Sequence, residues 1–205
     1  MVIANAGISG GDSVFALKDT PDPEEPDLNI LNIDLIGVLY TMRCAQHYWQ
    51  FDARPGDEKC FIIKSSLAGY VAVSAATQYS VSKYGVRGLM IQTRMSERCR
   101  VNVIAPWFIR TPIMSDVVAE RIGGLLKAAG TGWAEVEDSV QAALRIAADK
   151  EVNGRALAIV PKSEAKEGWV DCEVDDYTEL GKEKLARWAS WAGGFNHRTL
   201  PKDQQ

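Results

Sequence analysis

The chain has 205 residues, of which 46% are hydrophobic and 24% charged, and its formal net charge is −4. These values are typical of a globular protein and argue against general disorder. The acidic balance argues against nucleic acid as the main partner, because phosphate binding requires a basic face. No apolar run reaches the length of about 20 residues that a membrane span requires. The N-terminal residues also lack the basic region and cleavage site of a signal peptide.

The cysteines and histidines argue against a metal site. The four cysteines are widely scattered and form no CxxC pair, and the chain has only two histidines, His47 and His197. His47 falls on a predicted helix and is interpreted as a packing or surface residue. We therefore expect no bound metal and a reducing location, namely the cytoplasm.

Short apolar segments alternate along the chain with longer amphipathic ones. Residues 1–8 are predicted as a buried strand, and a loop rich in Gly, Asp, Ser and Pro follows to residue 26. Apolar residues then recur with helical spacing from Asp27, a candidate N-cap, to Phe51. The other predicted elements are a strand at 59–66, a helix at 78–98, a strand at 100–106, a mixed helical segment at 112–133, a helix near 136–147 and a strand within 153–161.

This order of elements predicts an α/β fold with a parallel sheet. Strands that alternate with helices are joined by right-handed crossovers, and strands covered on both faces lack polar alternation. Ligands of such sheets bind beyond the carboxyl ends of the strands. Three predicted strand ends carry distinctive residues, at 5–7, at 65–66 and at 106–111. We therefore expect the functional site at this edge of the sheet.

The chain is predicted to divide after residue 161. Residues 1–161 hold the alternating elements, and residues 162–205 form a C-terminal extension with one predicted helix over 183–194. Trp188 and Trp191 share one face of that helix and are interpreted as a docking stripe. An acidic cluster in the extension lacks the Gly and the terminal Glu of an EF-hand, so we interpret it as a solvated loop. Its members are Asp171, Glu173, Asp175 and Asp176.

One pair of residues suggests acid/base chemistry. Tyr79 and Lys83 stand four residues apart on a predicted helix and hence on one face. A phenol has a pKa of about 10, and a neighbouring lysine cation lowers that pKa by favouring the phenolate. Ser66 follows a strand thirteen residues before Tyr79 and could hold the same substrate oxygen. Alone, the pair favours a surface contact on a solvated helix face. The serine and the neighbouring strand ends reverse that preference and favour catalysis.

Several segments resemble the short-chain dehydrogenase/reductase family, and they occur in the family's order. They are ANAG at 4–7, SSLAG at 65–69, YSVSK at 79–83 and RVNVIAPWFIRTP at 100–112. The resemblance runs from residue 2 to about residue 161. In character these segments are similar to fungal relatives of 15-hydroxyprostaglandin and 5′-hydroxyaverantin dehydrogenases.

The resemblance implies a Rossmann-like doubly wound sheet and an oxidoreductase that uses NAD or NADP on a small-molecule secondary alcohol or ketone. It implies that Ser66 binds the substrate oxygen, that Tyr79 is the general acid/base, and that Lys83 lowers the pKa of Tyr79 and holds the nicotinamide ribose. Residues 112–133 correspond to a substrate-covering lid. Further implied contacts are Asn5, Ala6 and Gly7 with the adenosine side of the cofactor, Pro106 and Thr111 with its nicotinamide end, and Trp107, Ile113 and Met114 with the substrate.

The chain departs from the family pattern at three places. The Gly-rich fingerprint T-G-x-x-x-G-x-G is absent, so we expect a truncated sheet that begins at the family's fourth strand and weak or no dinucleotide binding. Asp34 stands where the family has an Asn that supports a proton-relay water, and we expect its charge to perturb Lys83. Trp107 replaces a Gly and is interpreted as shaping the substrate pocket.

Three functions therefore stay open. The first is an NAD(P)-dependent oxidoreductase. The second is a cofactor-independent isomerase, dehydratase or cyclase that uses Ser66 and Tyr79, because these reactions need an acid/base and an oxyanion donor but no hydride. The third is an inactive subunit. We also expect a homo-oligomer, because family dimers pack through the helices at 27–51 and 78–98, and because the first strand is left as an apolar sheet edge.

Overall fold

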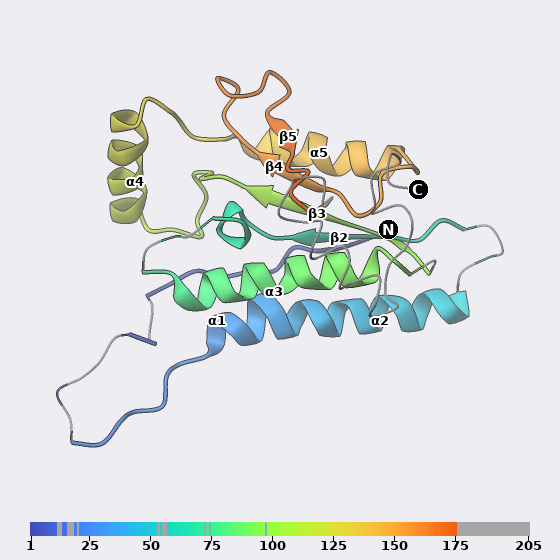
Figure 1. Ribbon diagram of the computed structural model, residues 1–205, viewed down its shortest axis with the longest axis horizontal. Coiled ribbons are helices and arrows are strands. Elements are labelled where there is room, and N and C mark those ends of the chain that lie inside the picture. The colour runs from blue at the N-terminus through green and yellow to red at the C-terminus, as the bar shows by residue number, and fades with distance from the viewer. Residues whose placement is uncertain are drawn as a thin grey trace, which may run out of the picture.

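A computed structural model gives the fold and describes residues 1–11, 14, 15, 19, 21–52, 54, 57–71, 73, 75–96 and 98–175. The predicted helix at 183–194, with Trp188 and Trp191, lies outside these residues. Within them, one sheet has helices on both of its faces (Figure 1). The predicted α/β class is therefore confirmed.

Five strands make up the sheet in the described residues, and they lie side by side in the order of the chain. Four run parallel: β1 (Val2–Ala4), β2 (Cys60–Lys64), β3 (Arg100–Pro106) and β4 (Ala156–Ile159). All four fall within segments that were predicted as strands, and β1 forms an edge of the sheet as expected.

The fifth strand was not expected. β5 (Trp169–Asp171) belongs to the predicted polar extension, yet it pairs antiparallel with β4. Three residues are too few to show a strand periodicity in the sequence, because a period of two needs a longer run to be recognised. The first part of the extension is therefore continuous with the sheet.

The long helix predicted from Asp27 consists of three parts. These are α1 (Asn29–Leu31), a π-helical turn η1 (Asn32–Ile36) and α2 (Gly37–Asp52). The N-cap is Leu28, not the predicted Asp27, and its side chain makes no capping hydrogen bond. Asp27 lies one residue earlier, and its Oδ1 accepts a hydrogen bond from the backbone N–H of Asn29 at 2.9 Å. A π turn is rare and often marks a functional position. Here it contains Asp34, whose side chain is fully buried.

The two faces of the sheet carry separate apolar cores. α2 and α3 (Thr77–Thr93) cover one face, where Phe61 and Ile63 of β2 are fully buried. α5 (Val136–Ala148) covers the other face, where Ile62 of β2 packs with Ile146. Successive side chains of a strand point to opposite faces, so β2 contributes to both cores without polar alternation.

One end of the sheet is the carboxyl end of the parallel strands, and the connections there are long. α4 (Asp116–Ala128) stands at this end beyond the arrowhead of β3, and the loop after β1 extends from the same side (Figure 1). The Oγ atom of Ser9 in that loop donates to the backbone oxygen of Ile113 at 3.3 Å. Among the described helices, none combines the length and the apolar character needed to cross a bilayer.

Candidate active site

Ser66 lies directly after β2, where the chain enters a 3₁₀ turn at Leu67–Gly69. Its Oγ accepts a hydrogen bond from the backbone N–H of Ala68 at 3.2 Å and so caps this turn. The same hydroxyl lies 3.5 Å from the backbone oxygen of Pro106, the last residue of β3. The turn therefore holds Ser66 between the ends of two neighbouring strands.

Tyr79 and Lys83 lie one turn apart on α3, as the spacing predicted. The Nζ atom of Lys83 is 5.2 Å from the centroid of the Tyr79 ring. The hydroxyl of Ser66 lies close enough to Tyr79 to lower the pKa of its phenol. The structure thus brings together the three residues that the sequence grouped as an acid/base site.

Asp34, in the π-helical turn η1, lies beside this group. Its Oδ2 lies 2.9 Å from Nζ of Lys83, and the side chains are 0% and 4% exposed, respectively. Its Oδ1 accepts a hydrogen bond from the backbone N–H of Ile8 at 2.8 Å. Nζ of Lys83 also donates to the backbone oxygen of Lys64 at 3.3 Å. Asp34 therefore links the loop after β1 to the lysine and compensates its charge in a buried position.

The pKa of Tyr79 differs from the sequence-based expectation. We expected Lys83 to lower it, but the pKa is raised, mainly because burial disfavours the phenolate. The hydroxyl of Ser66 lowers the pKa, and the negative charge of Asp34 raises it. Because Asp34 pairs with Lys83, the lysine charge that should favour a phenolate is offset. In this structure Tyr79 is therefore a neutral phenol at neutral pH.

Close backbone packing fixes the serine turn against α3. A Cβ atom at Gly69 would lie only 2.7 Å from the backbone oxygen of Lys83, so no larger residue fits without a shift. In addition, Oγ of the buried Ser65 donates to the same Lys83 oxygen at 3.3 Å. The distance between Ser66 and Tyr79 thus depends on contacts of the neighbouring backbone.

The residues predicted to contact a cofactor lie at the ends of β1 and β3. Asn5 and Ala6 are exposed directly after β1, and Gly7 lies beside the Asp34–Lys83 pair, where a Cβ would come within 3.4 Å of Asp34 Oδ2. Pro106 closes β3, and Thr111 is half-buried in the following loop.

The residues predicted to contact substrate follow β3. Trp107 packs at the edge of the α5-side core with its ring 4.9 Å from that of Phe108. Met114 is half-buried, whereas Ile113 is 44% exposed. In the lid segment, the indole of Trp133 lies against Gly123 of α4, where a Cβ would be 3.6 Å from the ring. Aromatic side chains thus border this end of the sheet.

An ion pair that the sequence does not indicate anchors the serine turn. Arg87, four residues after Lys83 on α3, binds Oδ1 of Asp175 through Nε at 2.9 Å and Nη2 at 2.7 Å. Its Nη1 donates to the backbone oxygen of Gly69 at 3.1 Å, and its guanidinium lies 4.3 Å from the Tyr70 ring centroid. The spacing of Lys83 and Arg87 indicated a shared helix face, but nothing local marked Asp175 as its partner.

The interpretation of the acidic cluster as a solvated loop is therefore wrong for Asp171 and Asp175, whereas Glu173 is exposed. Asp175 is only 5% exposed, because Arg87 and Arg94 hold it against α3. Asp171 pairs with Arg155, whose Nε lies 2.6 Å from Oδ2 of Asp171. Asp176 lies outside the described residues.

Part of a nicotinamide dinucleotide fits the residues present. The ammonium of Lys83 has three N–H groups. It pairs with Asp34 and donates to the Lys64 carbonyl, so it can still donate to a ribose hydroxyl. Asn5 and Ala6 are exposed at the same edge. A Gly-rich loop for the pyrophosphate is not among these 205 residues. The donor set therefore fits the nicotinamide-ribose end of the cofactor.

Comparison with known proteins agrees with this geometry. The chain matches the short chain dehydrogenase family over residues 1–122. A 5′-hydroxyaverantin dehydrogenase of Dothistroma septosporum is 37% identical over 172 residues, which are 76% of this chain and 56% of that protein. A second one, from Emericella nidulans, is 30% identical over 165 residues, which are 72% of this chain and 54% of that protein. The chain thus spans about half the length of these curated relatives.

Solved structures share the fold. A gluconate 5-dehydrogenase from Burkholderia cenocepacia, in complex with NADP and tartrate, superimposes with a TM-score of 0.62 at 21% identity, over 80% of this chain and 64% of that chain. The family match covers more than half of the chain. The chain belongs to the short chain dehydrogenase family.

Proposed function

We propose that this chain carries the acid/base site of an NAD(P)-dependent oxidoreductase that interconverts a ketone and a secondary alcohol. The observation that carries the proposal is the convergence of Ser66, Tyr79 and Lys83 at the carboxyl end of the sheet. The names of the fungal relatives support a hydroxylated secondary metabolite as substrate. The aromatic border formed by Trp107 and Trp133 supports a largely apolar one.

The chemistry follows from the protonation state of Tyr79. Burial keeps its phenol neutral, so Tyr79 acts most directly as an acid that donates a proton to a carbonyl oxygen. Ser66 donates a hydrogen bond to the same oxygen and thereby stabilises the developing negative charge. When bound beside Lys83, a reduced nicotinamide would supply the hydride that the carbonyl carbon accepts. Tyr79 regains its proton from solvent after the alcohol has formed.

The reverse reaction has a stricter requirement. Oxidation of an alcohol needs Tyr79 as phenolate to accept the hydroxyl proton. Since burial and Asp34 both raise the pKa of Tyr79, the phenolate is scarce at neutral pH. The rate of alcohol oxidation should therefore increase as the pH is raised, whereas ketone reduction needs no such increase.

A substitution of the phenol tests the proposal. The protein is incubated with NADH or NADPH and a panel of apolar ketones, and oxidation of the nicotinamide is followed by absorbance. Tyr79→Phe should abolish the reaction, whereas Tyr84→Phe, which changes an exposed tyrosine on the same helix, should leave it unchanged. Loss of the ketone that depends on Tyr79 but proceeds without oxidation of the nicotinamide would point to the cofactor-independent alternative. Equal turnover of both variants would contradict an acid/base site.

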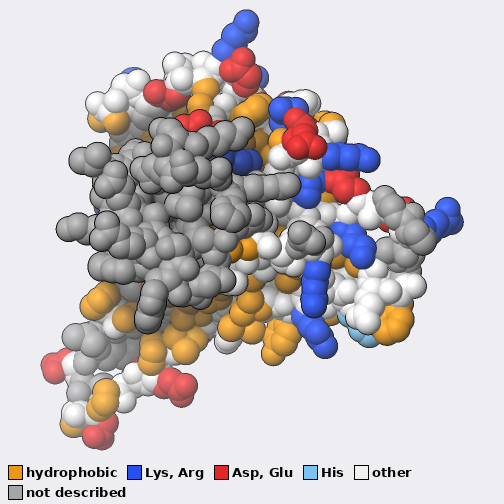
Figure 2. Space-filling view, turned by 45° about the vertical axis from the view of Figure 1, so that its right-hand side comes forward, with side chains coloured by type: hydrophobic (Ala, Val, Ile, Leu, Met, Phe, Trp, Pro, Cys, Tyr) orange, Lys and Arg blue, Asp and Glu red, His pale blue; other side chains and the backbone are white. Residues whose placement is uncertain are grey.

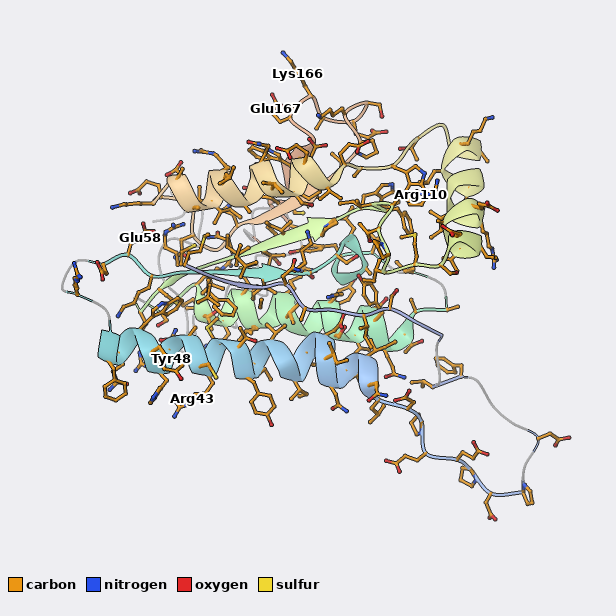
Figure 3. All side chains as sticks on the ribbon, turned by 180° about the vertical axis from the view of Figure 1, so that it is seen from behind. Arg43, Tyr48, Glu58, Arg110, Lys166 and Glu167 are labelled. Carbon is orange, nitrogen blue, oxygen red and sulfur yellow. The ribbon has the colours of Figure 1, made fainter. Side chains whose placement is uncertain are left out.

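We also propose a homo-oligomer that packs through α2 and α3. Side chains of exposed apolar residues gather along the lower side of the molecule, where α2 runs (Figure 2). On α2, Tyr40 is 69% and Tyr48 61% exposed. Figure 3 labels Tyr48 and Arg43 on this helix. Light scattering tests this proposal: the protein should form at least dimers, and Tyr40→Glu should shift them toward monomers. A monomer at all concentrations would contradict it.

The cytoplasm remains our proposed location. All four cysteines of the chain are free thiols, which suits a reducing compartment. Burial raises the pKa of Cys60, Cys99 and Cys172, so these thiols are mainly protonated and react slowly. Imaging of a tagged protein in its host cell would test the location.

A further inference from the structure

Lys64 is a charged residue at the candidate site that neither the family motifs nor the proposed mechanism uses. It is the last residue of β2 and directly precedes Ser65 and Ser66. The first four residues of β2 are fully or almost fully buried, and Lys64 itself is half-buried. A lysine at the inner end of such an apolar strand requires an explanation, because burial of an unpaired ammonium is unfavourable.

The position of Lys64 places it on the side of the sheet where substrate contacts are expected. Lys64 pairs in register with Ile104 of β3, and Ile104 belongs to the α5-side core. Paired residues of neighbouring strands project to the same face of a sheet. Trp107 packs against this same core. Lys64 and Trp107 thus share one face at the carboxyl end of the strands.

No counter-ion accompanies Lys64. Within the part of the chain that the structure describes, its Nζ atom forms no hydrogen bond or ion pair. Its neighbouring charge is Lys83, which is of the same sign and already has Asp34 as its partner. Burial, together with the charge of Lys83, lowers the pKa of Lys64 to about 8. A lysine that merely packed its stem and extended its amine into water would keep a pKa close to its ordinary value.

We propose that Lys64 binds an oxyanion, a carboxylate or a phosphate, of the ligand that occupies the Ser66–Tyr79 site. Two residues of an extended strand span about 7 Å, so an anion at Lys64 lies within one small molecule of an oxygen held by Ser66. An anion there would supply the missing counter-charge and would offset the repulsion between Lys64 and Lys83. The proposal rests on the proposed function for the location of the ligand, but not for the reaction.

The anion has two chemical sources. A substrate can carry a carboxylate, or a dinucleotide can present its phosphates. Both make charge-assisted hydrogen bonds with an ammonium group, and one such bond corresponds to about a tenfold to hundredfold change in affinity. The experiment must therefore present each source separately.

Binding and labelling together test the proposal. Separate samples of the protein are acetylated at their amines: one without anions, and the others with inorganic phosphate, NADPH or succinate. The modification of Lys64 in each sample is measured by mass spectrometry. Dimethyl succinate is the uncharged match for succinate. We expect protection of Lys64 by phosphate and NADPH if the source is a dinucleotide, or by succinate but not by its ester if the source is a substrate.

Variants measure the contribution of the charge. Lys64→Met keeps most of the side-chain length but removes the amine, and it should weaken binding of the protecting anion by tenfold or more in calorimetry. Lys64→Arg should retain most of the affinity. Lys150→Met, at an exposed position beyond α5, is the matched control and should bind like the parent protein.

Two results would overturn the proposal: equal labelling of Lys64 with and without every anion, or equal anion affinity of Lys64→Met and the parent protein. Protection of Lys64 without any turnover would support the anion site and contradict only the reaction. Conversely, Tyr79-dependent turnover with an unchanged KM in Lys64→Met would support the reaction and contradict the anion site.

Discussion

The Nζ atom of Lys83 lies 2.9 Å from Oδ2 of Asp34, and both side chains are buried. A buried ion pair offsets the desolvation of each charge only while both partners are present. Here the pair also cancels much of the field that Lys83 exerts on Tyr79, one turn earlier on the same helix. The residue at position 34 therefore controls how acidic Tyr79 is.

Asp34→Asn should lower the pKa of Tyr79, because it removes a negative charge that raises this pKa and leaves the charge of Lys83 uncompensated. The ionisation can be followed by NMR of carbon-labelled tyrosine, with Tyr79→Phe to assign the resonance. Asp138→Asn is the matched control, because Asp138 is also buried and pairs with a lysine, Lys162. If the pKa of Tyr79 is the same in the parent protein, in Asp34→Asn and in Asp138→Asn, this relationship is contradicted.

The same Asp34→Asn substitution should reduce stability. Loss of one partner from a buried ion pair typically costs about 3–5 kcal/mol, because the remaining charge stays buried. The free energy of unfolding can be measured by urea denaturation at neutral pH. A change of less than about 1 kcal/mol, as for an exposed pair, would show that the Lys83 charge finds another partner.

Lys64→Met should stabilise the ligand-free protein in a manner that depends on pH. The pKa of Lys64 is about 8 in the folded protein against an ordinary value of 10.5, so the unfolded chain binds more protons between these values. Below about pH 8 the buried charge of Lys64 lowers the free energy of unfolding of the parent protein by its full amount. This penalty disappears as the pH rises from about 8 to 10.5, so the free energy of unfolding increases over that range. The advantage of Lys64→Met should be largest near pH 7 and smallest near pH 10.5.

Urea denaturation at these two pH values, in a buffer without phosphate or carboxylate, measures that difference. Lys150→Met is again the control, and its effect should not change with pH. If the effect of Lys64→Met is the same at both pH values, then Lys64 has an ordinary pKa in the folded protein.

Asp175→Asn should destabilise the fold more than Asp171→Asn. Asp175 is nearly buried and receives two N–H groups of Arg87, so its loss should cost about 3 kcal/mol. Asp171 and Arg155 are each more than a quarter exposed, so that pair should contribute about 1 kcal/mol or less. Denaturation curves of the two variants provide the comparison, and equal losses would contradict the anchoring role of Arg87.

Gly69→Ala should displace the serine turn. The added Cβ would lie 2.7 Å from the Lys83 backbone oxygen, so either the turn or α3 must move, at a cost of about 1–3 kcal/mol. Since Ser66 lies three residues before Gly69, turnover should also fall. Gly88→Ala is the control, because nothing lies within 4 Å of a Cβ there and alanine favours a helix. Full activity of Gly69→Ala would mean that the turn adapts without moving Ser66.

The sequence by itself determined the order of the main elements and the position of the site. Four strands and the long helices could be predicted from apolar runs and helical spacing, because the buried positions of an element are apolar and recur at a regular spacing. Ser66, Tyr79 and Lys83 lie close together in the structure, as expected, because strand ends meet at one edge and residues four apart share a helix face.

Only the tertiary structure decided how these residues are charged and anchored. The raised pKa of Tyr79, the lack of a counter-ion for Lys64 among the described residues, and the contact of Arg87 with Asp175 depend on burial and on residues far apart in the chain. β5 was likewise too short to show a period, and its antiparallel pairing with β4 appears only in the folded chain. Local patterns record which face of an element is covered, but long-range electrostatics depend on what covers it.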